Sequence, residues 1–223
     1  MKKIISIIVT VMILTSLAAC KSSAPAETAA SSAETEAQAG TAAETEVQSE
    51  TVGETEAQAE AQTGAASDVL VAYFSATGTT KGVAEKIASV TGGDLYEILA
   101  DEPYSSDDLN YNDSNSRTTK EQNDKNVRPE IGSEAISLEG YSTIYLGFPI
   151  WWGEEPRILD TFAESYSFEG ITVIPFCTSG GSGIGRSGSN MEALAGSGTW
   201  LEGKRFDGGV SEEDLKAWID GLK

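Results

Sequence analysis

The sequence predicts an α/β fold with a parallel sheet, and two features of residues 68–223 carry this prediction. The apolar runs at residues 68–74, 143–148 and 171–176 are continuous, which is typical of strands buried on both faces of a parallel sheet. Segments with helical apolar spacing separate these runs. Strands that alternate with helices favour a sheet with helices packed on both faces.

The other elements follow along the chain in the order expected for such a fold. The first helix begins near Thr80 and ends at Gly92 and Gly93, a common stop signal. The last helix starts from a capping sequence at Ser211 and continues to Leu222. The remaining expected elements are strands at residues 94–99 and 199–201 and helices at residues 154–165 and 188–194.

Residues 100–137 form a long polar segment between the second and third expected strands. We predict a short helix at residues 107–123 within it, followed by a loop. Long irregular segments in compact domains are often functional. The segment therefore either covers a site or is a surface insertion without a role.

The first twenty residues have the layout of an export signal. Lys2 and Lys3 precede an apolar run at residues 4–17, which is too short to span a bilayer comfortably. The small residues that follow end directly in Cys20, which resembles the bacterial lipoprotein signal. We predict a signal peptide at residues 1–19 and a lipid, such as diacylglycerol with palmitate, on Cys20. The alternative is an ordinary cleaved signal in which this cysteine is incidental.

Residues 20–67 are predicted to form a disordered acidic linker. After Cys20 they consist almost wholly of Ala, Glu, Thr, Ser, Gln and Gly, with Lys21 against nine glutamates and without an aromatic residue. Such a composition buries too little apolar surface to fold. As a flexible coil the linker would reach roughly 35–40 Å. A helical stalk is the competing interpretation, but no apolar stripe supports it.

Charge and composition exclude several kinds of function. Of 35 acidic and 15 basic residues, nine glutamates and three lysines precede residue 68, which leaves 26 acidic and 12 basic in the domain. Nucleic acid is therefore not an expected partner. The chain has no His, and its only cysteine outside the signal is Cys177. A Ser-His-Asp triad, a His-ligated zinc site, a His-ligated haem and a cysteine-held iron–sulfur cluster all need residues that are absent, and we expect no metal. Either carboxylates or an organic cofactor must carry the chemistry.

The loop after the first strand is the first candidate site segment. It offers four hydroxyls, a glycine and the amino terminus of a helix, where free N–H groups and the helix dipole favour an anion. The loop lacks the dinucleotide fingerprint and the Walker sequence. We predict a phosphate cradle; a polar turn with a threonine cap is the alternative. Its residues are Ser75, Ala76, Thr77, Gly78, Thr79 and Thr80.

Two further loops follow the third and fourth strands, where ligands of parallel sheets bind. The second loop places two adjacent indoles at a strand end, where one ring could stack on a flat ligand while the other packs inward. Its residues are Pro149, Ile150, Trp151, Trp152 and Gly153. The third loop is rich in glycine, which lets a backbone approach a planar ligand closely. Its candidate residues are Thr178, Ser179, Gly180 and Gly181.

In motif, order and spacing, these three loops resemble those of a short-chain flavodoxin, and the resemblance covers residues 68–223. It implies a flavodoxin-like three-layer sandwich with a five-stranded parallel sheet in the order 2-1-3-4-5, and flavin mononucleotide (FMN) as cofactor. The family's first loop, S/T-x-T-G-x-T, binds the FMN phosphate and corresponds to residues 75–80. The other two loops flank the isoalloxazine, which implies Trp151 or Trp152 as the stacking aromatic and residues 178–181 as the other wall.

Two departures from the family bear on function. Many flavodoxins stack a tyrosine from the third loop, but this loop has no aromatic residue, so one ring face is open or covered by residues 104–115. The Pro-Ile-Trp-Trp-Gly segment also resembles a flavodoxin-like subgroup described as FMN-dependent oxidoreductases.

We therefore predict an exported electron-transfer protein, held at the extracytoplasmic membrane face by its lipid, that binds FMN and uses no catalytic side chain. Its partner is an unidentified redox protein or small acceptor. One alternative is an FMN-dependent NAD(P)H or quinone oxidoreductase. Another is a flavin-free binding lipoprotein that keeps the fold.

Overall fold

The protein is described by a computed structural model that covers residues 67–222. The predicted signal peptide, Cys20 and most of the predicted linker lie outside these residues. Strands and helices alternate along the described part. They are β1 (Val69–Tyr73), α1 (Thr79–Thr91), β2 (Asp94–Glu97), α2 (Arg117–Asn123), β3 (Thr143–Pro149), α3 (Arg157–Ser165), β4 (Thr172–Thr178), α4 (Ser187–Ala195), β5 (Thr199–Trp200), β6 (Lys204–Phe206) and α5 (Glu212–Asp220).

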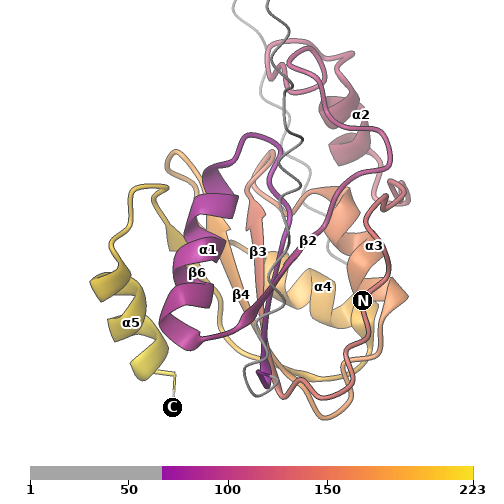
Figure 1. Cartoon of the computed structure of the whole chain (residues 1–223). Coiled ribbons are helices and arrows are strands. Elements are labelled where there is room, and N and C mark those ends of the chain that lie inside the picture. The colour runs from indigo at the N-terminus through magenta and orange to yellow at the C-terminus, as the bar shows by residue number, and fades with distance from the viewer. Residues whose placement is uncertain (1–66, 223) are drawn as a thin grey trace, which may run out of the picture. The chain divides into compact units, whose positions relative to one another are not determined.

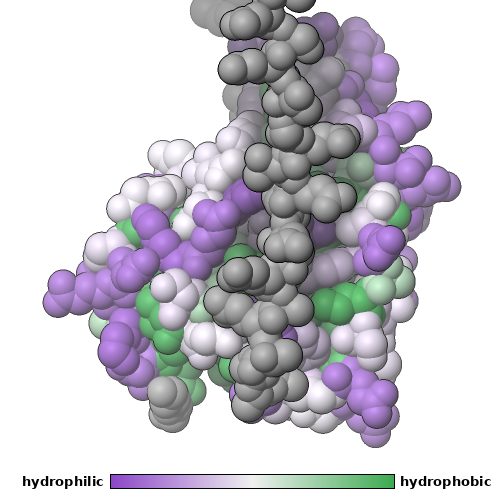
Figure 2. Space-filling model, viewed as in Figure 1, coloured by the Kyte–Doolittle hydropathy of each residue, from purple (hydrophilic) through white to green (hydrophobic). Residues whose placement is uncertain are grey.

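The strands form one parallel sheet in the order β2-β1-β3-β4-β5, which confirms the predicted fold. Helices α1 and α5 cover one face and α3 and α4 cover the other (Figure 1). The inserted segment with α2 lies at the carboxyl end of the strands (Figure 1). Most of the visible surface of this inserted segment is hydrophilic (Figure 2). Within residues 67–222, no helix is long and apolar enough to cross a membrane.

The edge strand is split in two, so the sheet has six strands where five were expected. β5 pairs with the beginning of β4 and β6 pairs with its end. The interruption lies opposite Pro175, which has no N–H to donate. Val173 faces the same edge of β4 as Pro175, and its carbonyl still accepts a hydrogen bond from the N–H of Leu201. The edge ladder therefore stops at the proline and resumes at Lys204.

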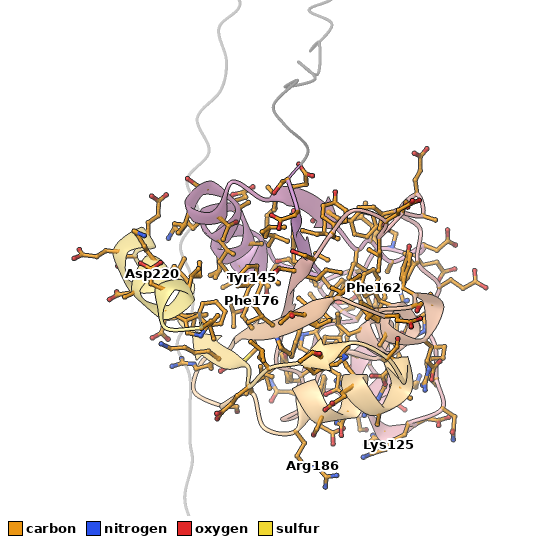
Figure 3. All side chains as sticks on the ribbon, turned by 90° about the horizontal axis from the view of Figure 1, so that it is seen from below. Lys125, Tyr145, Phe162, Phe176, Arg186 and Asp220 are labelled. Atoms are coloured by element: carbon orange, nitrogen blue, oxygen red, sulfur yellow. The ribbon has the colours of Figure 1, made fainter. Side chains whose placement is uncertain are left out.

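Two apolar clusters hold the helices to the sheet, one on each face. Tyr145 and Phe176 belong to the cluster beneath α1 and α5, whereas Phe162 belongs to the cluster beneath α3 and α4. Figure 3 shows these labelled side chains on opposite sides of the sheet. The continuous apolar runs in the sequence predicted strands that are buried on both faces. In the structure, β1, β3 and β4 are buried almost throughout.

The helix predicted at residues 107–123 is wrong in its first half, because only Arg117–Asn123 is helical. Short polar side chains upstream bond to nearby backbone instead of leaving it free for a helix. The Asp108 carboxylate accepts from the N–H of Ser105, and that of Asp113 accepts from the N–H of Asn115. The hydroxyl of Ser116 then caps α2 by accepting from the N–H of Thr119.

Candidate functional site

The three predicted loops meet at the carboxyl edge of the sheet, beside β1. In the sheet, β1 lies between β2 and β3, so the strand order reverses at β1. Ligands of open parallel sheets bind at such a reversal. A pocket of about 470 Å³ opens at this edge, within the usual range for small-molecule sites. Thr77 and Thr79 line it from the first loop, and Asp207 and Gly208 line it beyond β6.

The first loop has the features that a phosphate requires. Gly78 adopts the left-handed conformation (φ 83°) at the start of α1, and no described side chain caps this helix end. The backbone N–H groups of the first turn are therefore free for a ligand. The Ser75 hydroxyl oxygen is buried without a hydrogen-bond partner among the described residues. A buried hydroxyl without a partner is destabilising, and a phosphate oxygen at this loop would satisfy it, so the loop fits a phosphate group.

Thr80 differs from its neighbours in the loop because it is buried. Its hydroxyl lies 2.8 Å from that of Thr178, which joins the first loop to the third. The N–H of Ile150 also donates to the carbonyl of Thr178 at 2.9 Å, which joins the second loop to the third. These two bonds hold all three loops in register; a direct contact of Thr80 with phosphate stays a prediction.

The second loop is a tight hairpin turn. Trp151 and Glu154 exchange two backbone hydrogen bonds of 3.0 and 3.1 Å across Trp152 and Gly153. The two central residues both have positive φ, 50° and 85°, as a type I′ turn requires. This conformation is uncommon for a residue as bulky as tryptophan and strained there. The turn thus holds the Trp152 side chain outward at a conformational cost.

The two tryptophans have different environments. Trp151 is buried and packs edge-on against Phe74 and Tyr104, with ring centroids 5.5 and 5.1 Å away. Trp152 is 41% exposed, and its ring centroid lies 4.5 Å from that of Tyr111. Trp151 also lines the pocket, together with Pro149 and Ile150 of the same loop. Which indole stacks on a ligand stays a prediction.

The third loop forms an open wall of the pocket through Thr178, Ser179 and Gly180. A Cβ atom added at Gly180 would meet no described atom within 4 Å, so a ligand could approach the backbone there. The Arg205 guanidinium anchors the loop by donating to the Ser179 carbonyl at 2.7 Å and its hydroxyl at 3.2 Å. Burial raises the pKa of the Cys177 thiol to about 12, which suits a packing role at the strand end.

Four residues that line the pocket lie outside the three predicted loops: Leu109 and Tyr111, which belong to the region 104–115 named as a possible cover for the ring, and Asp207 and Gly208, which were not predicted. The first two come from the inserted segment, which was expected either to cover a site or to have no role. The last two follow β6, a strand that was not expected. Asp207-Gly208-Gly209 was the available signal, since such residues mark a turn at a strand end.

A buried ionic cluster lies directly behind the second loop. The Arg157 guanidinium is within 3.2 Å of Asp160 and 3.8 Å of Glu155, and all three residues are at least 97% buried. The side-chain amide of Gln122 donates to the carbonyls of Trp151 and Glu155 at 3.1 and 3.0 Å. Helix α2 and the ionic cluster thus hold the backbone of the tryptophan loop from behind.

The Asp160 carboxyl gives this cluster a pH dependence. Burial and the nearby Glu155 carboxylate raise its pKa to about 6, although Arg157 and Arg128 oppose the shift. A raised pKa means that the folded state favours the protonated form, so the stability contributed by this group is present below about pH 4 and lost as the pH rises through 6.

Asp160→Asn should therefore raise the free energy of unfolding at pH 7.5 by about 1–3 kcal/mol, because the amide resembles the favoured neutral form. The advantage should disappear near pH 4, where the native carboxyl is protonated. Urea unfolding of the native protein and of Asp160→Asn at these two pH values measures the difference in stability. A variant that is less stable at pH 7.5 would contradict the assigned direction of the pKa shift.

Within residues 67–222, no three side chains are grouped so that they could hold a metal ion. Hydroxyls, backbone amides and aromatic rings surround the pocket instead. An open parallel sheet with such a pocket at its switch point defines a mononucleotide-binding protein of the flavodoxin type. The chain belongs to the flavodoxin family, whose model matches residues 68–222.

Solved structures of similar proteins agree with this assignment. The chain is 44% identical to a protein from Bacteroides eggerthii described as a flavoprotein, with a TM-score of 0.65 over 69% of this chain and 96% of that one. For a similarly described protein from Bacteroides uniformis the identity is 43% and the TM-score 0.66, over 70% and 99%. A flavoprotein from Lactobacillus acidophilus in complex with FMN is 26% identical, with a TM-score of 0.53 over 69% and 99%. No curated protein matches the chain.

Proposed function

We propose that the pocket binds FMN and that the protein transfers electrons with it. The observation that carries this proposal is the unpartnered, buried Ser75 hydroxyl in the loop that leads to the uncapped amino terminus of α1, since one phosphate could satisfy both. The FMN complex of the Lactobacillus acidophilus relative supports this choice of cofactor. The phosphate would bind residues 75–80, and the isoalloxazine would lie between the tryptophan loop and residues 178–181.

The flavin supplies one- and two-electron redox chemistry when bound, and the protein's residues bind and orient it. In the described part of the chain, Thr178 and Arg205 fix the third loop while Gln122 fixes the second. Cys177 is buried, with a raised thiol pKa, so it is not suited to act as a nucleophile. We therefore assign no catalytic side chain.

We also propose that the domain works at a membrane surface outside the cytoplasm. The lipoprotein-like sequence that ends at Cys20 and the acidic composition of residues 21–67 support this location. Two acyl chains would give a stable anchor. The redox partner would be a protein or small acceptor within reach of the linker. Labelling of cells with radioactive palmitate, compared between the native chain and Cys20→Ala, tests the anchor, and equal labelling would refute it.

An FMN-dependent NAD(P)H or quinone oxidoreductase is the second candidate. The absence of an aromatic residue from residues 178–181 and the open space at Gly180 favour it, because a flat substrate could reach the ring from that side. Steady-state oxidation of NADH or NADPH by the FMN-loaded protein separates the two functions. Turnover with a quinone would support the oxidoreductase, whereas its absence would favour the electron carrier.

Titration of residues 67–223 with FMN tests the proposal directly. This domain should fold alone, because its Bacteroides relatives are covered over 96% and 99% of their lengths by this chain. We expect flavin fluorescence to be quenched with one FMN per chain, since aromatic rings line the pocket. Unquenched fluorescence at saturating protein would overturn FMN binding and leave the flavin-free binding lipoprotein.

A further inference from the structure

We propose that Tyr111 of the inserted segment provides the second aromatic wall of the flavin site, in place of the aromatic residue that the third loop lacks. The inference rests on the proposed FMN binding and extends it to the isoalloxazine ring. Tyr111 lines the same pocket as Ile150 and Trp151 of the second loop and Gly180 of the third, although it is distant from all three in sequence.

The inserted segment holds Tyr111 in place from both sides. The hydroxyl of Thr118 donates to the carbonyl of Asp108, three residues before the tyrosine. The hydroxyl of Thr119 donates to the carbonyl of Asp113, two residues after it, at 3.0 Å. Both threonines lie on α2 and are buried. The segment that carries Tyr111 is therefore an ordered part of the domain.

The position of the Tyr111 ring suits contact with a flat ligand. Tyr111 is 57% exposed, so a ligand can reach its side chain. One partner is Trp152, at 4.5 Å between centroids and 33° between ring planes, and Leu109 of the same segment lines the pocket beside it. The tyrosine hydroxyl is neutral at physiological pH, and burial raises its pKa further. A neutral aromatic ring with exposed surface at a pocket can stack on isoalloxazine.

Trp152 strengthens the inference. The turn holds this residue with a positive φ, a conformation that bulky residues rarely adopt. The strained residue is the one that contacts Tyr111, and strain of this kind tends to occur at ligand sites. The two rings come from separate segments and pack against each other, and Tyr111 also lines the pocket. This aromatic pair predicts preference for the flavin ring, independent of the phosphate.

Tyr111→Ala should weaken binding of both FMN and riboflavin by about tenfold, because stacking of a base on an aromatic ring contributes about 1–3 kcal/mol. Riboflavin lacks the phosphate, so an equal loss for both ligands excludes a phosphate contact and is the result expected for stacking on the ring. Tyr111→Phe should keep both affinities within about twofold, since the stacking surface remains. Quenching of flavin fluorescence on titration with residues 67–223 measures all of these constants.

Two controls separate direct contact from other causes. Tyr141 donates a hydrogen bond to Asp94 at the opposite end of the sheet, so Tyr141→Ala should leave flavin affinity unchanged. Trp152→Asn removes the neighbouring indole while keeping a residue that tolerates positive φ. The effect of Tyr111→Ala should persist in this background if the tyrosine itself contacts the ligand.

Each outcome bears on a different claim. Unchanged affinity in Tyr111→Ala, with normal FMN binding by the native domain, would overturn the role of Tyr111 but leave the proposed function standing. Loss of the Tyr111→Ala effect in the Trp152→Asn background would also overturn it, because the tyrosine would then act only by supporting the tryptophan. Failure of the native domain to bind either flavin would overturn the proposed function as well.

Discussion

Replacing Arg157 with Met is expected to lower the free energy of unfolding by about 3–5 kcal/mol at pH 7. Arg157 is 97% buried, and its guanidinium is the cation closest to the buried Glu155 and Asp160 carboxylates. It also donates to Glu154 at 2.8 Å and to the backbone carbonyl of Gln122 at 3.3 Å. Methionine fills similar space but leaves two buried carboxylates without this partner, and an uncompensated buried charge is strongly destabilising.

The loss should shrink as the pH falls. At pH 5 the Asp160 carboxyl is largely protonated even in the native protein, because its pKa is raised to about 6, so less negative charge remains to be compensated. Arg186→Met is a matched control, because Arg186 is exposed and points into solvent (Figure 3), and it should change stability by less than about 0.5 kcal/mol. Urea unfolding measures both variants. A loss below about 1 kcal/mol for Arg157→Met would show that the positive charge of Arg157 does not stabilise the folded protein.

The same variant should disturb the tryptophan loop. Arg157 holds the backbone of Gln122, and Gln122 in turn holds the carbonyl of Trp151. The ionic cluster therefore acts on the flavin pocket through backbone hydrogen bonds. The loop depends on residues that do not line the pocket, which is common for sites that must keep a fixed geometry.

Much of the sheet could be predicted because burial on both faces leaves a strong pattern. The apolar runs of β1, β3 and β4 extend without polar interruption, and parallel sheets require such runs. The three loops follow these strands directly, so their meeting at one edge follows from parallel strand direction. For the same reason the position of residues 75–80 at this edge could be predicted from the sequence alone.

The rest depends on long-range contacts that have no local pattern. Leu109 and Tyr111 belong to a polar segment whose path is set by bonds from Thr118 and Thr119. β6 is three residues long, too short for periodicity to be detected. In the sequence, Glu155, Arg157 and Asp160 look like ordinary surface charges at a helix start, and only tertiary packing reveals that they are buried.

Replacing Ser75 with Ala should weaken FMN binding by about 10- to 150-fold without destabilising the ligand-free protein. A hydrogen bond to a charged group contributes about 1.5–3 kcal/mol, and the phosphate is the charged group expected beside this hydroxyl. In the ligand-free chain the Ser75 oxygen is buried and has no partner among residues 67–222. Its removal should therefore leave the free energy of unfolding unchanged or raise it by about 1 kcal/mol.

Riboflavin and a second buried serine make this prediction specific. Riboflavin has no phosphate, so its affinity should stay within about twofold in Ser75→Ala, in contrast to the equal loss expected for both ligands in Tyr111→Ala. The Ser187 hydroxyl is also buried without a partner in the described part of the chain, but it belongs to α4 and not to the first loop. Ser187→Ala should match Ser75→Ala in stability and leave FMN affinity unchanged. An equal loss of riboflavin affinity in Ser75→Ala would overturn the phosphate assignment at the first loop, because the two ligands differ only in the phosphate.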